Sequence, residues 1–435
     1  MSHLQQKILI SELHEGLMEK FVLWVHSLLG YEVLLFCKTN EQIKSSKYKC
    51  NDYSSLRNYD FSIFFHRKAE WSEKLYKEVE VNVEDNVETT KFRILIKDIF
   101  QRSLKDFDYL IYLAELKTQE YANVKIRCRW NLVRSQTLNK CIVTNDIAVS
   151  FSFLPSVSKN IKKIIKPSAL KKIINLVRPK LKPKSLSDKK ISKVIFFPHK
   201  GLAYGDSFEK DYYYSDVASS PLNQNNILHL EYIPFKSSVA KSYLNKNLEF
   251  DFIKKPTSLD ALKYLMKNLK SILTNVAKHN KHKHLSFMST ILFAYIDMLA
   301  SFLSEFYLRK MSSIVGCKFA LIGYDVLLPK EISLALHRLG VETIAIQERY
   351  TLPHAGNYNL VIDNYLVWSY NVETMINDSI GDSYVGNYIV TGPPRSDKVN
   401  LDKRNTIHGL RKKIIVYSNS PEPENVNKYT RLNCW

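Results

Sequence analysis

Between Lys193 and about Asp397, short apolar segments alternate with helical patterns, and this alternation constrains the fold more than any other feature. The apolar segments are nearly continuous, as expected for strands of a parallel sheet that is covered on both faces. The predicted strands are Val194–Phe197, Asn226–Tyr232, Phe319–Gly323, Val341–Ile346, Asn364–Trp368 and Asn387–Thr391, and the predicted helices are Ser258–His279, Leu285–Arg309 and Pro329–Leu339. We therefore predict an α/β fold with a Rossmann-like domain over residues 193–400.

Residues 1–157 have the features of a further α/β domain, and a chain of 435 residues is long enough for two or three cores. Helical spacing covers Gly16–Leu29. The predicted strands are Lys7–Ser11, Tyr31–Cys37, Asp60–His66, Val124–Val133 and Cys141–Phe153. No pattern in this part points to a particular chemistry, so the sequence predicts no role for it.

Residues 158–192 form a basic segment between these two domains. Thirteen lysines and arginines stand between Lys159 and Lys193 against one acid, Asp188, in a chain whose net charge is +20. Aliphatic residues recur at helical spacing among them, which predicts an amphipathic helix interrupted by prolines. The lysines predicted to face a membrane are Lys162, Lys163, Lys166, Lys171 and Lys172.

Three interpretations of this segment remain open. A lysine-rich amphipathic helix suits an anionic membrane surface. A linker that packs its apolar face on its own protein explains the same pattern. Nucleic acid is less favoured than either, because no aromatic residues alternate with the lysines.

The six cysteines are scattered and lack the spacing of a zinc site, so we expect free thiols, no metal and no other cofactor. The first residues lack the pattern of a signal peptide. One segment, Leu285–Leu308, approaches the composition of a membrane span, but it carries Asp297 and Glu305, and charges within a bilayer are costly. We interpret it as a buried helix and expect a cytoplasmic protein, with the inner face of the membrane as a candidate partner.

Ligands of parallel α/β sheets bind beyond the carboxyl ends of the strands, so the loops after the predicted strands form the candidate site. The loop after Val194–Phe197 contains His199, Lys200, Gly201, Tyr204 and Asp206. Glycine lets the backbone approach a ligand closely, and His199 or Asp206 can act as a general base. A tight turn with a solvated histidine is the alternative.

Further polar residues follow later strands. Asp325 comes after Phe319–Gly323, and Glu348, Arg349 and His354 come after Val341–Ile346. A functional role and an ordinary salt bridge between loops explain the Glu348–Arg349 pair equally well.

The segment Thr391–Asp397, TGPPRSD, follows the last of these strands. Its Arg395 has a fork suited to phosphate or carboxylate, and Asp397 can cap the next segment or pair with Arg395. After a further predicted strand, Lys413–Tyr417, the residues Ser418 and Ser420 have the character of a phosphate-binding loop.

The order of these motifs resembles the crossover between the two Rossmann domains of GT-B glycosyltransferases that build bacterial surface polysaccharides. The closest pattern is that of CDP-glycerol glycerophosphotransferases and related capsule or lipopolysaccharide transferases. Their tGxPRxD element is matched by Thr391, Gly392, Pro394, Arg395 and Asp397. The resemblance covers residues 190–425. It implies transfer of a sugar from a nucleotide-activated donor to a glycan acceptor, with a lipid-linked glycan expected.

Two departures from that pattern matter. The family has His–Gly where this chain has Gln347–Glu348–Arg349, so the family's catalytic histidine is not carried over. The resemblance also implies a second donor-binding domain, of which residues 401–435 are only the start. The base candidates are therefore His199, Asp206 and Glu348, with Tyr204 and Arg349 expected to position the acceptor.

Other functions remain open at this point. A truncated, non-catalytic remnant or a membrane-associated scaffold of a polysaccharide assembly complex fits the basic segment. A CDP-glycerol-type glycerophosphotransferase fits the Thr391–Asp397 motif. A nucleic-acid binder fits only the net charge.

Overall fold

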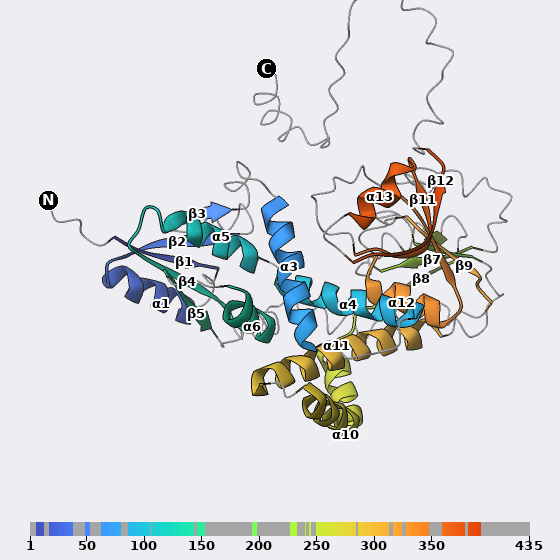
Figure 1. The fold of residues 1–435 in the computed structure, drawn as a ribbon, viewed down its shortest axis with the longest axis horizontal. Helices are drawn as coiled ribbons and strands as arrows, with labels where there is room; N and C mark the ends of the chain where they lie inside the picture. Colours follow the sequence, from blue (N-terminus) through green and yellow to red (C-terminus); the bar gives the residue numbers. More distant parts are fainter. Residues whose placement is uncertain are drawn as a thin grey trace, which may run out of the picture. The chain divides into compact units, whose positions relative to one another are not determined.

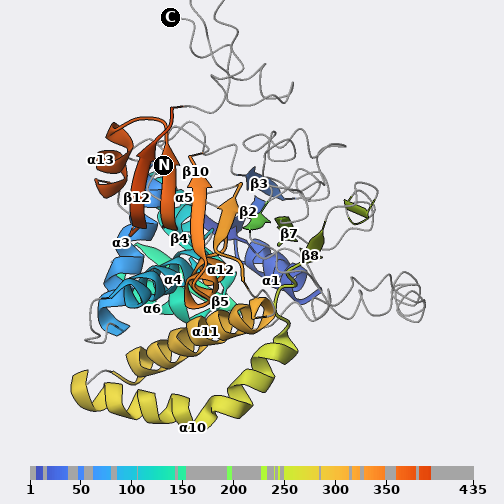
Figure 2. The ribbon, with the colours of Figure 1, turned by 90° about the vertical axis from the view of Figure 1, so that its right-hand side faces the viewer.

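The computed structural model describes much of the chain up to Gly392. The described residues are 6–12, 17–37, 48–52, 62–79, 86–104, 106–142, 146–152, 194–197, 227–232, 240, 243–244, 249–283, 286–312, 316–323, 328–347, 359–378 and 382–392. The chain divides into two compact units, Met1–Gly392 and Pro393–Trp435, and every described residue belongs to the first. Two parallel sheets form the frame of that unit (Figures 1 and 2).

The first sheet has five parallel strands in the order β3-β2-β1-β4-β5. Their bounds are β1 Lys7–Ser11, β2 Tyr31–Cys37, β3 Lys49–Asp52, β4 Asn123–Arg129 and β5 Ile147–Ser152. Successive side chains of a strand point to opposite faces, so Ile8 and Ile10 enter one core and Leu9 enters another. Both faces of this sheet are therefore covered.

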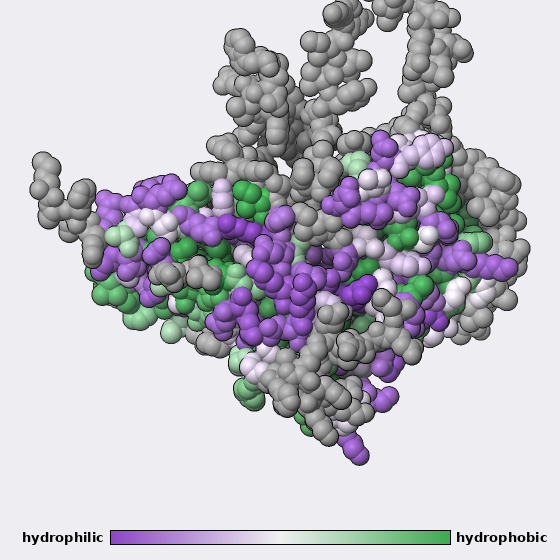
Figure 3. All heavy atoms as spheres, in the orientation of Figure 1, coloured by the Kyte–Doolittle hydropathy of each residue, from purple (hydrophilic) through white to green (hydrophobic). Residues whose placement is uncertain are grey.

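Five helices accompany the first sheet. They are α1 Leu17–Leu28, α3 Ser62–Val79, α4 Val87–Ser103, α5 Phe107–Lys117 and α6 Leu132–Cys141. Helix α1 packs Leu23 against Leu9, whereas α3, α5 and α6 contribute to the larger core that contains Ile8 and Ile10. Hydrophilic side chains gather on the outer side of α3 and α4 in the view of Figure 3.

The second sheet has seven parallel strands in the order β12-β11-β10-β9-β6-β7-β8. Their bounds are β6 Val194–Phe197, β7 Ile227–Glu231, β8 Phe250–Phe252, β9 Phe319–Ile322, β10 Glu342–Ile346, β11 Val361–Val367 and β12 Tyr384–Val390. The accompanying helices are α10 Ser258–Lys283, α11 Phe287–Met311, α12 Lys330–Arg338 and α13 Asn371–Asn377. Side chains of α11, α12 and α13 share a core with Ile195, Ala320 and Ile362.

Helix α11 touches both cores. Leu292, Phe293 and Ile296 join the core of the first sheet, and Tyr307 and Met311 join that of the second. This helix alone among the described helices is long and apolar enough to cross a membrane, with 39% of its most apolar window buried. A core helix of a folded domain passes the same test, and α11 packs on α3, α4, α6, α10 and α12.

The α/β class and the parallel sheet after Lys193 are confirmed, and several strands match the prediction closely. The predicted strand Asp60–His66 is wrong, because α3 begins at Ser62 and places Phe64, Trp71 and Leu75 at helical spacing in the core. The prediction for Val124–Val133 is too long, since Asn131 caps α6 by accepting a hydrogen bond from the Arg134 N–H.

The predicted strand Cys141–Phe153 also begins too early, because α6 continues to Cys141 and β5 begins only at Ile147. The basic segment 158–192 and the predicted start of a further domain, 401–435, lie outside the described residues.

Candidate functional site

Both sheets are wound in the same way, and this determines where a ligand site is expected. In the first sheet the chain moves outward from β1 to β3 and then returns to add β4 on the other side of β1. The second sheet repeats this with β6, β7 and β8 on one side and β9 to β12 on the other. Doubly wound sheets bind ligands at the carboxyl ends of the strands where the direction reverses. The two expected places are the β1/β4 and β6/β9 ends.

A buried ion pair lies at the β1/β4 end. Arg134 donates from Nη1 to Glu12 Oε1 at 2.7 Å, and both side chains are less than a tenth exposed. The same oxygen accepts the backbone N–H of Arg129 at 2.6 Å. The guanidinium of Arg134 also lies over the ring of Phe107. Glu12 is therefore held in one position by two donors beside the first turn of α6.

A second pair ties α1 to the same end of the sheet. Arg127 donates from Nε and Nη2 to Glu19 Oε2 at 3.1 and 2.9 Å, and the Ser152 hydroxyl donates to Glu19 Oε1 at 3.1 Å. Glu19 lies in the first turn of α1, so one carboxylate links that helix to β4 and β5. Both acids at this end thus have cationic partners within the protein.

Exposed groups also stand at the end of β4. Arg129 and Trp130 are exposed there, next to the buried Cys128. Burial raises the pKa of the Cys128 thiol to about 12, which leaves no thiolate for nucleophilic chemistry. A guanidinium beside an indole can bind the phosphate and base of a nucleotide, so this pair is the part of the end suited to a ligand.

At the corresponding end of the second sheet, three adjacent strands finish side by side. The Gly323 N–H donates to the Phe197 carbonyl at 2.7 Å, and Ile322 is in register with Ala345. Buried Gln347 follows β10 and accepts the Trp368 backbone N–H at 2.9 Å. The loops after β6, β9 and β10 therefore leave the sheet at neighbouring points.

At this end of the second sheet, the indole N–H of Trp368 stands out. Its Nε1–H is buried and has no acceptor among the described residues. Buried donors are nearly always satisfied in folded proteins. The indole N–H thus marks a point at the β11 end where a further acceptor is expected.

A buried polar group lies at the β7 end. The Tyr243 hydroxyl donates to Glu231 Oε1 at 2.6 Å, and both residues are buried. The imidazole of His229 packs edge-on to Phe196 and beside the Tyr243 ring. Burial lowers the pKa of His229 to about 3, so its imidazole is neutral at physiological pH.

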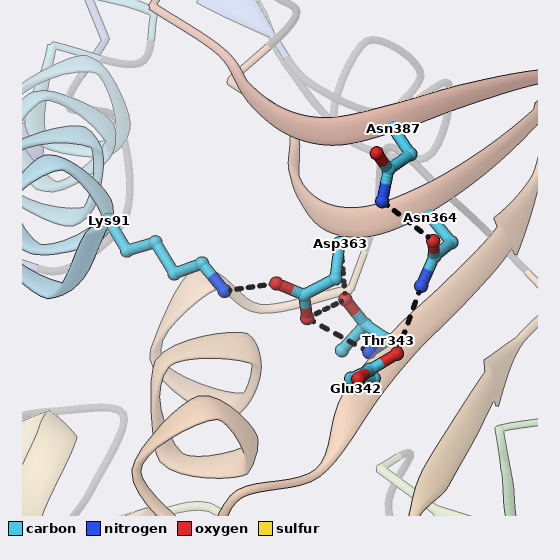
Figure 4. A network of polar contacts seen from close by, with 6 residues as sticks. All are labelled: Lys91, Glu342, Thr343, Asp363, Asn364 and Asn387. Atoms are coloured by element: carbon cyan, nitrogen blue, oxygen red, sulfur yellow. Dashed lines mark hydrogen bonds and ion pairs between the residues drawn. The ribbon is translucent and has the colours of Figure 1, made fainter.

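The best-connected polar network lies at the opposite, amino-terminal end of the second sheet (Figure 4). Lys91 of α4 donates to Asp363 Oδ1 at 2.6 Å, and Thr343 donates to Asp363 Oδ2 from its backbone N–H and its hydroxyl. Lys91 is 1% exposed and also lies over the Tyr384 ring. Burial acts to raise the pKa of Asp363, but the hydrogen bonds from Lys91 and Thr343 outweigh it and lower that pKa.

Glycine is required at one position beside this network. Gly386 of β12 lies opposite Asp363, and a Cβ added there would be 2.6 Å from the Asp363 carbonyl oxygen. The amide of Asn387 bonds Asn364, which in turn donates to Glu342 on the exposed side (Figure 4).

Helix α4 makes several other polar contacts with the second sheet and its helices. Arg102 donates to both oxygens of Glu331, and Arg338 bonds Glu88. Gln101 accepts a hydrogen bond from the Asn359 amide at 3.0 Å. Although α4 belongs to the first 157 residues, it packs on α12 and contacts β12. Helix α4 thus connects the two sheets, as α11 does through the two cores.

Every site residue that the sequence singled out lies outside the described residues. These are His199, Lys200, Gly201, Tyr204, Asp206, Asp325, Glu348, Arg349, His354, Arg395, Asp397, Ser418 and Ser420, together with the lysines Lys162, Lys163, Lys166, Lys171 and Lys172. The described neighbours show only where their segments begin. Gly392, before Pro393, has φ +77°, a conformation that favours glycine.

Sequence reasoning missed the residues at the β1/β4 end. The signal was present in the run RCRWN, because two arginines stand at the end of β4 and an asparagine cap follows it. The pair of acids in Asp106–Phe107–Asp108 was missed as well. Asp108 is buried and paired with Lys68 Nζ at 3.2 Å. Across the described ranges, no three His, Cys, Asp or Glu side chains gather in a group that could hold a metal ion.

Comparison with known proteins adds no family assignment. No protein-family model, curated protein or solved structure matches this chain significantly.

Proposed function

We propose that this chain is a glycosyltransferase that transfers a sugar from a nucleotide-activated donor to a surface-polysaccharide acceptor. The observation that carries the proposal is the presence of two parallel sheets, each with its own reversal of winding, in one compact unit. Two-Rossmann transferases divide donor and acceptor between two such sheets. In this proposal the sheets of residues 7–152 and 194–390 supply the two halves.

The second sheet supplies the groups that react. His199 follows β6 by two residues and Glu348 follows β10 by two, and these strands flank β9, which Asp325 follows. A base that takes the proton of an acceptor hydroxyl suits His199, Asp206 or Glu348. Lys200 and Arg395 can neutralise the phosphate that leaves with the nucleotide, and Tyr204 and Arg349 can position the acceptor. The indole N–H of Trp368, which has no acceptor within the described part of the chain, supports a ligand at this end.

The first sheet supplies a second binding surface. Arg129 and Trp130 are exposed where the winding of that sheet reverses, and the Glu12–Arg134 pair fixes the backbone beneath them. The donor class implied by the resemblance is a nucleotide sugar. CDP-glycerol is the related donor that the test must separate from it.

The test uses the full chain and a panel of UDP, GDP and CDP as binding probes, followed by the matching sugar nucleotides and CDP-glycerol as donors. We expect one nucleotide to raise the melting temperature and its sugar conjugate to release nucleotide in the presence of acceptor. His199→Ala, Asp206→Ala and Glu348→Ala are compared with Leu28→Ala, which changes an exposed side chain at the end of α1, outside the site.

Loss of the base should lower the transfer rate by about 10²–10⁴ without loss of nucleotide binding. The proposal fails if none of the nucleotides binds, or if all three variants transfer as fast as the parent. Release of cytidine nucleotide from CDP-glycerol alone would instead identify a glycerophosphotransferase.

A further inference from the structure

Helix α10 has an apolar stripe on its outer side. Leu259, Leu262, Met266, Leu269 and Leu273 recur at alternating spacings of three and four residues. At 3.6 residues per turn, this places all five on one side of the helix. All five are exposed, and Met266 is 73% exposed. A helix that packs on a protein normally turns such a stripe inward.

The inner side of α10 is already occupied by α11, which is its main partner among the described elements. Tyr264 contacts the Phe302 ring and donates to Glu305 at 3.3 Å. Figure 2 shows α11 between α10 and the rest of the described unit. The exposed stripe is therefore a second apolar side, distinct from the one that the fold uses.

Lysines border this stripe. Lys263, Lys267 and Lys270 are exposed and fall on the side of the helix next to it. Over Ser258–Lys283 the chain has six lysines against one acid, Asp260. The stripe thus adjoins a concentrated positive charge.

Further exposed apolar groups lie at the start of α11. Phe287, Met288, Ile291 and Tyr295 are exposed although they belong to the described helix that is long and apolar enough to cross a membrane. Contact of Tyr264 with Phe302 shows that the two helices run antiparallel, so the first turns of α11 lie beside the later turns of α10. Both helices of the α10–α11 hairpin therefore carry exposed apolar groups.

We propose that the outer side of the α10–α11 hairpin binds an anionic membrane surface. Leucine and methionine side chains would enter the boundary between headgroups and acyl chains, while the lysines meet lipid phosphates. Charge decides between this and a second copy of the chain. Two copies paired along the stripe would bring Lys263, Lys267 and Lys270 of each close together, with Asp260 as the one acid on that side of the helix.

This inference is independent of the proposed transfer activity, and its test needs no donor or acceptor. The full chain is mixed with vesicles of phosphatidylcholine, with and without phosphatidylglycerol, and the bound fraction is measured by flotation. We expect binding that depends on phosphatidylglycerol and weakens with salt.

Two variants separate the apolar from the electrostatic contribution to membrane binding. The variant Met266→Ser, Leu269→Ser, Leu273→Ser should bind at least tenfold more weakly, because apolar burial is lost. The variant Lys263→Ala, Lys267→Ala, Lys270→Ala should bind roughly a hundredfold more weakly, since each lysine near an anionic surface strengthens binding about fivefold. Both sets are exposed, so circular dichroism should be unchanged.

The matched control is Leu244→Ser, Tyr370→Ser, Ile389→Ser, which removes three exposed apolar side chains elsewhere and should bind as the parent does. A fourth variant changes Lys162, Lys163, Lys166, Lys171 and Lys172 to alanine. The proposal is overturned if only this fourth variant loses binding, or if the parent binds no vesicles. It is also overturned if light scattering without lipid shows a dimer that the serine variant abolishes.

Discussion

The two sheets are wound alike, but their buried ion pairs lie at opposite ends. In the first sheet, Glu12 and Arg134 pair at the carboxyl ends of the strands, where ligands of such sheets bind. In the second, Lys91 and Asp363 pair at the amino ends. The described residues at the carboxyl end of the second sheet are mostly uncharged.

The end at which a pair lies indicates whether it only stabilises the fold or also lies near a ligand site. An ion pair at the amino ends of parallel strands is away from the expected ligand and joins elements of the fold, as Lys91 joins α4 to β11. A pair at the carboxyl ends instead lies beneath the surface that a ligand would touch. We therefore expect the second sheet to depend on the Lys91–Asp363 pair for its stability.

The largest effect is expected for Asp363→Ala. This change leaves the Lys91 ammonium, 1% exposed, without its carboxylate and removes the acceptor of two Thr343 donors. Leaving one partner of a buried pair uncompensated costs about 3–5 kcal/mol of unfolding free energy. Guanidinium unfolding measures this, with Asn364→Ala, its half-buried neighbour, as the control. A loss no greater than that of the control would remove the supporting role of the pair.

The second-largest effect is expected in the pH dependence of the unfolding free energy, through His229 of β7. The unfolded His229 takes up its proton near pH 6.5, but the folded one does so only near pH 3, because burial opposes its charge. The contribution of neutral His229 to the unfolding free energy is therefore complete above pH 6.5 and is lost as the pH falls toward 3. The unfolding free energy should decrease by about 3 kcal/mol between pH 7 and pH 4. His229→Phe should flatten that dependence in urea unfolding, whereas the control His26→Asn should retain it.

Asp108 of α5, a helix that accompanies the first sheet, should give a pH dependence of the opposite sign. Burial raises its pKa to about 6, against the opposing charge of Lys68. The folded state of an acid with a raised pKa holds its proton more tightly than the unfolded state does. The resulting gain in unfolding free energy is complete below the unfolded pKa, near 4, and is lost as the pH rises to 6. Asp108→Asn should remove a change of about 2 kcal/mol over that window. If the exposed control Asp146→Asn gives the same curve, burial of Asp108 has no such effect.

The smallest effect is expected at the start of α4, which packs on helices of both sheets. Asn86 caps α4 by accepting the Thr89 N–H, and the Thr89 hydroxyl accepts the Asn86 N–H in return. Asn86→Ala should lower the unfolding free energy by about 1 kcal/mol. Thermal unfolding of this variant and of Asn377→Ala, an exposed position in α13, should differ by that amount. Equal melting temperatures would show that α4 does not need its cap.

The sequence predicted much of the second sheet and little of what connects the sheets. The strand Val194–Phe197 is apolar throughout and Val341–Ile346 is largely so, and Gly340, with φ +72°, follows α12 as the pattern predicted. Asp60–His66 misled because its aromatic residues suit a strand, whereas the helical spacing of Phe64, Trp71 and Leu75 emerges only over a longer window. The residues predicted to react fall outside the described ranges, so those assignments stay predictions.

By itself, the sequence determined the α/β class, the parallel sheet after Lys193 and the concentration of positive charge. These follow from periodicity and composition, which act within a few residues. Only the tertiary structure decided that Lys91 meets Asp363, 272 residues away, that Glu12 meets Arg134, and that α10 leaves one of its apolar sides exposed. The physical reason is that the partner of a charge and the burial of an apolar side chain depend on segments that only folding brings together.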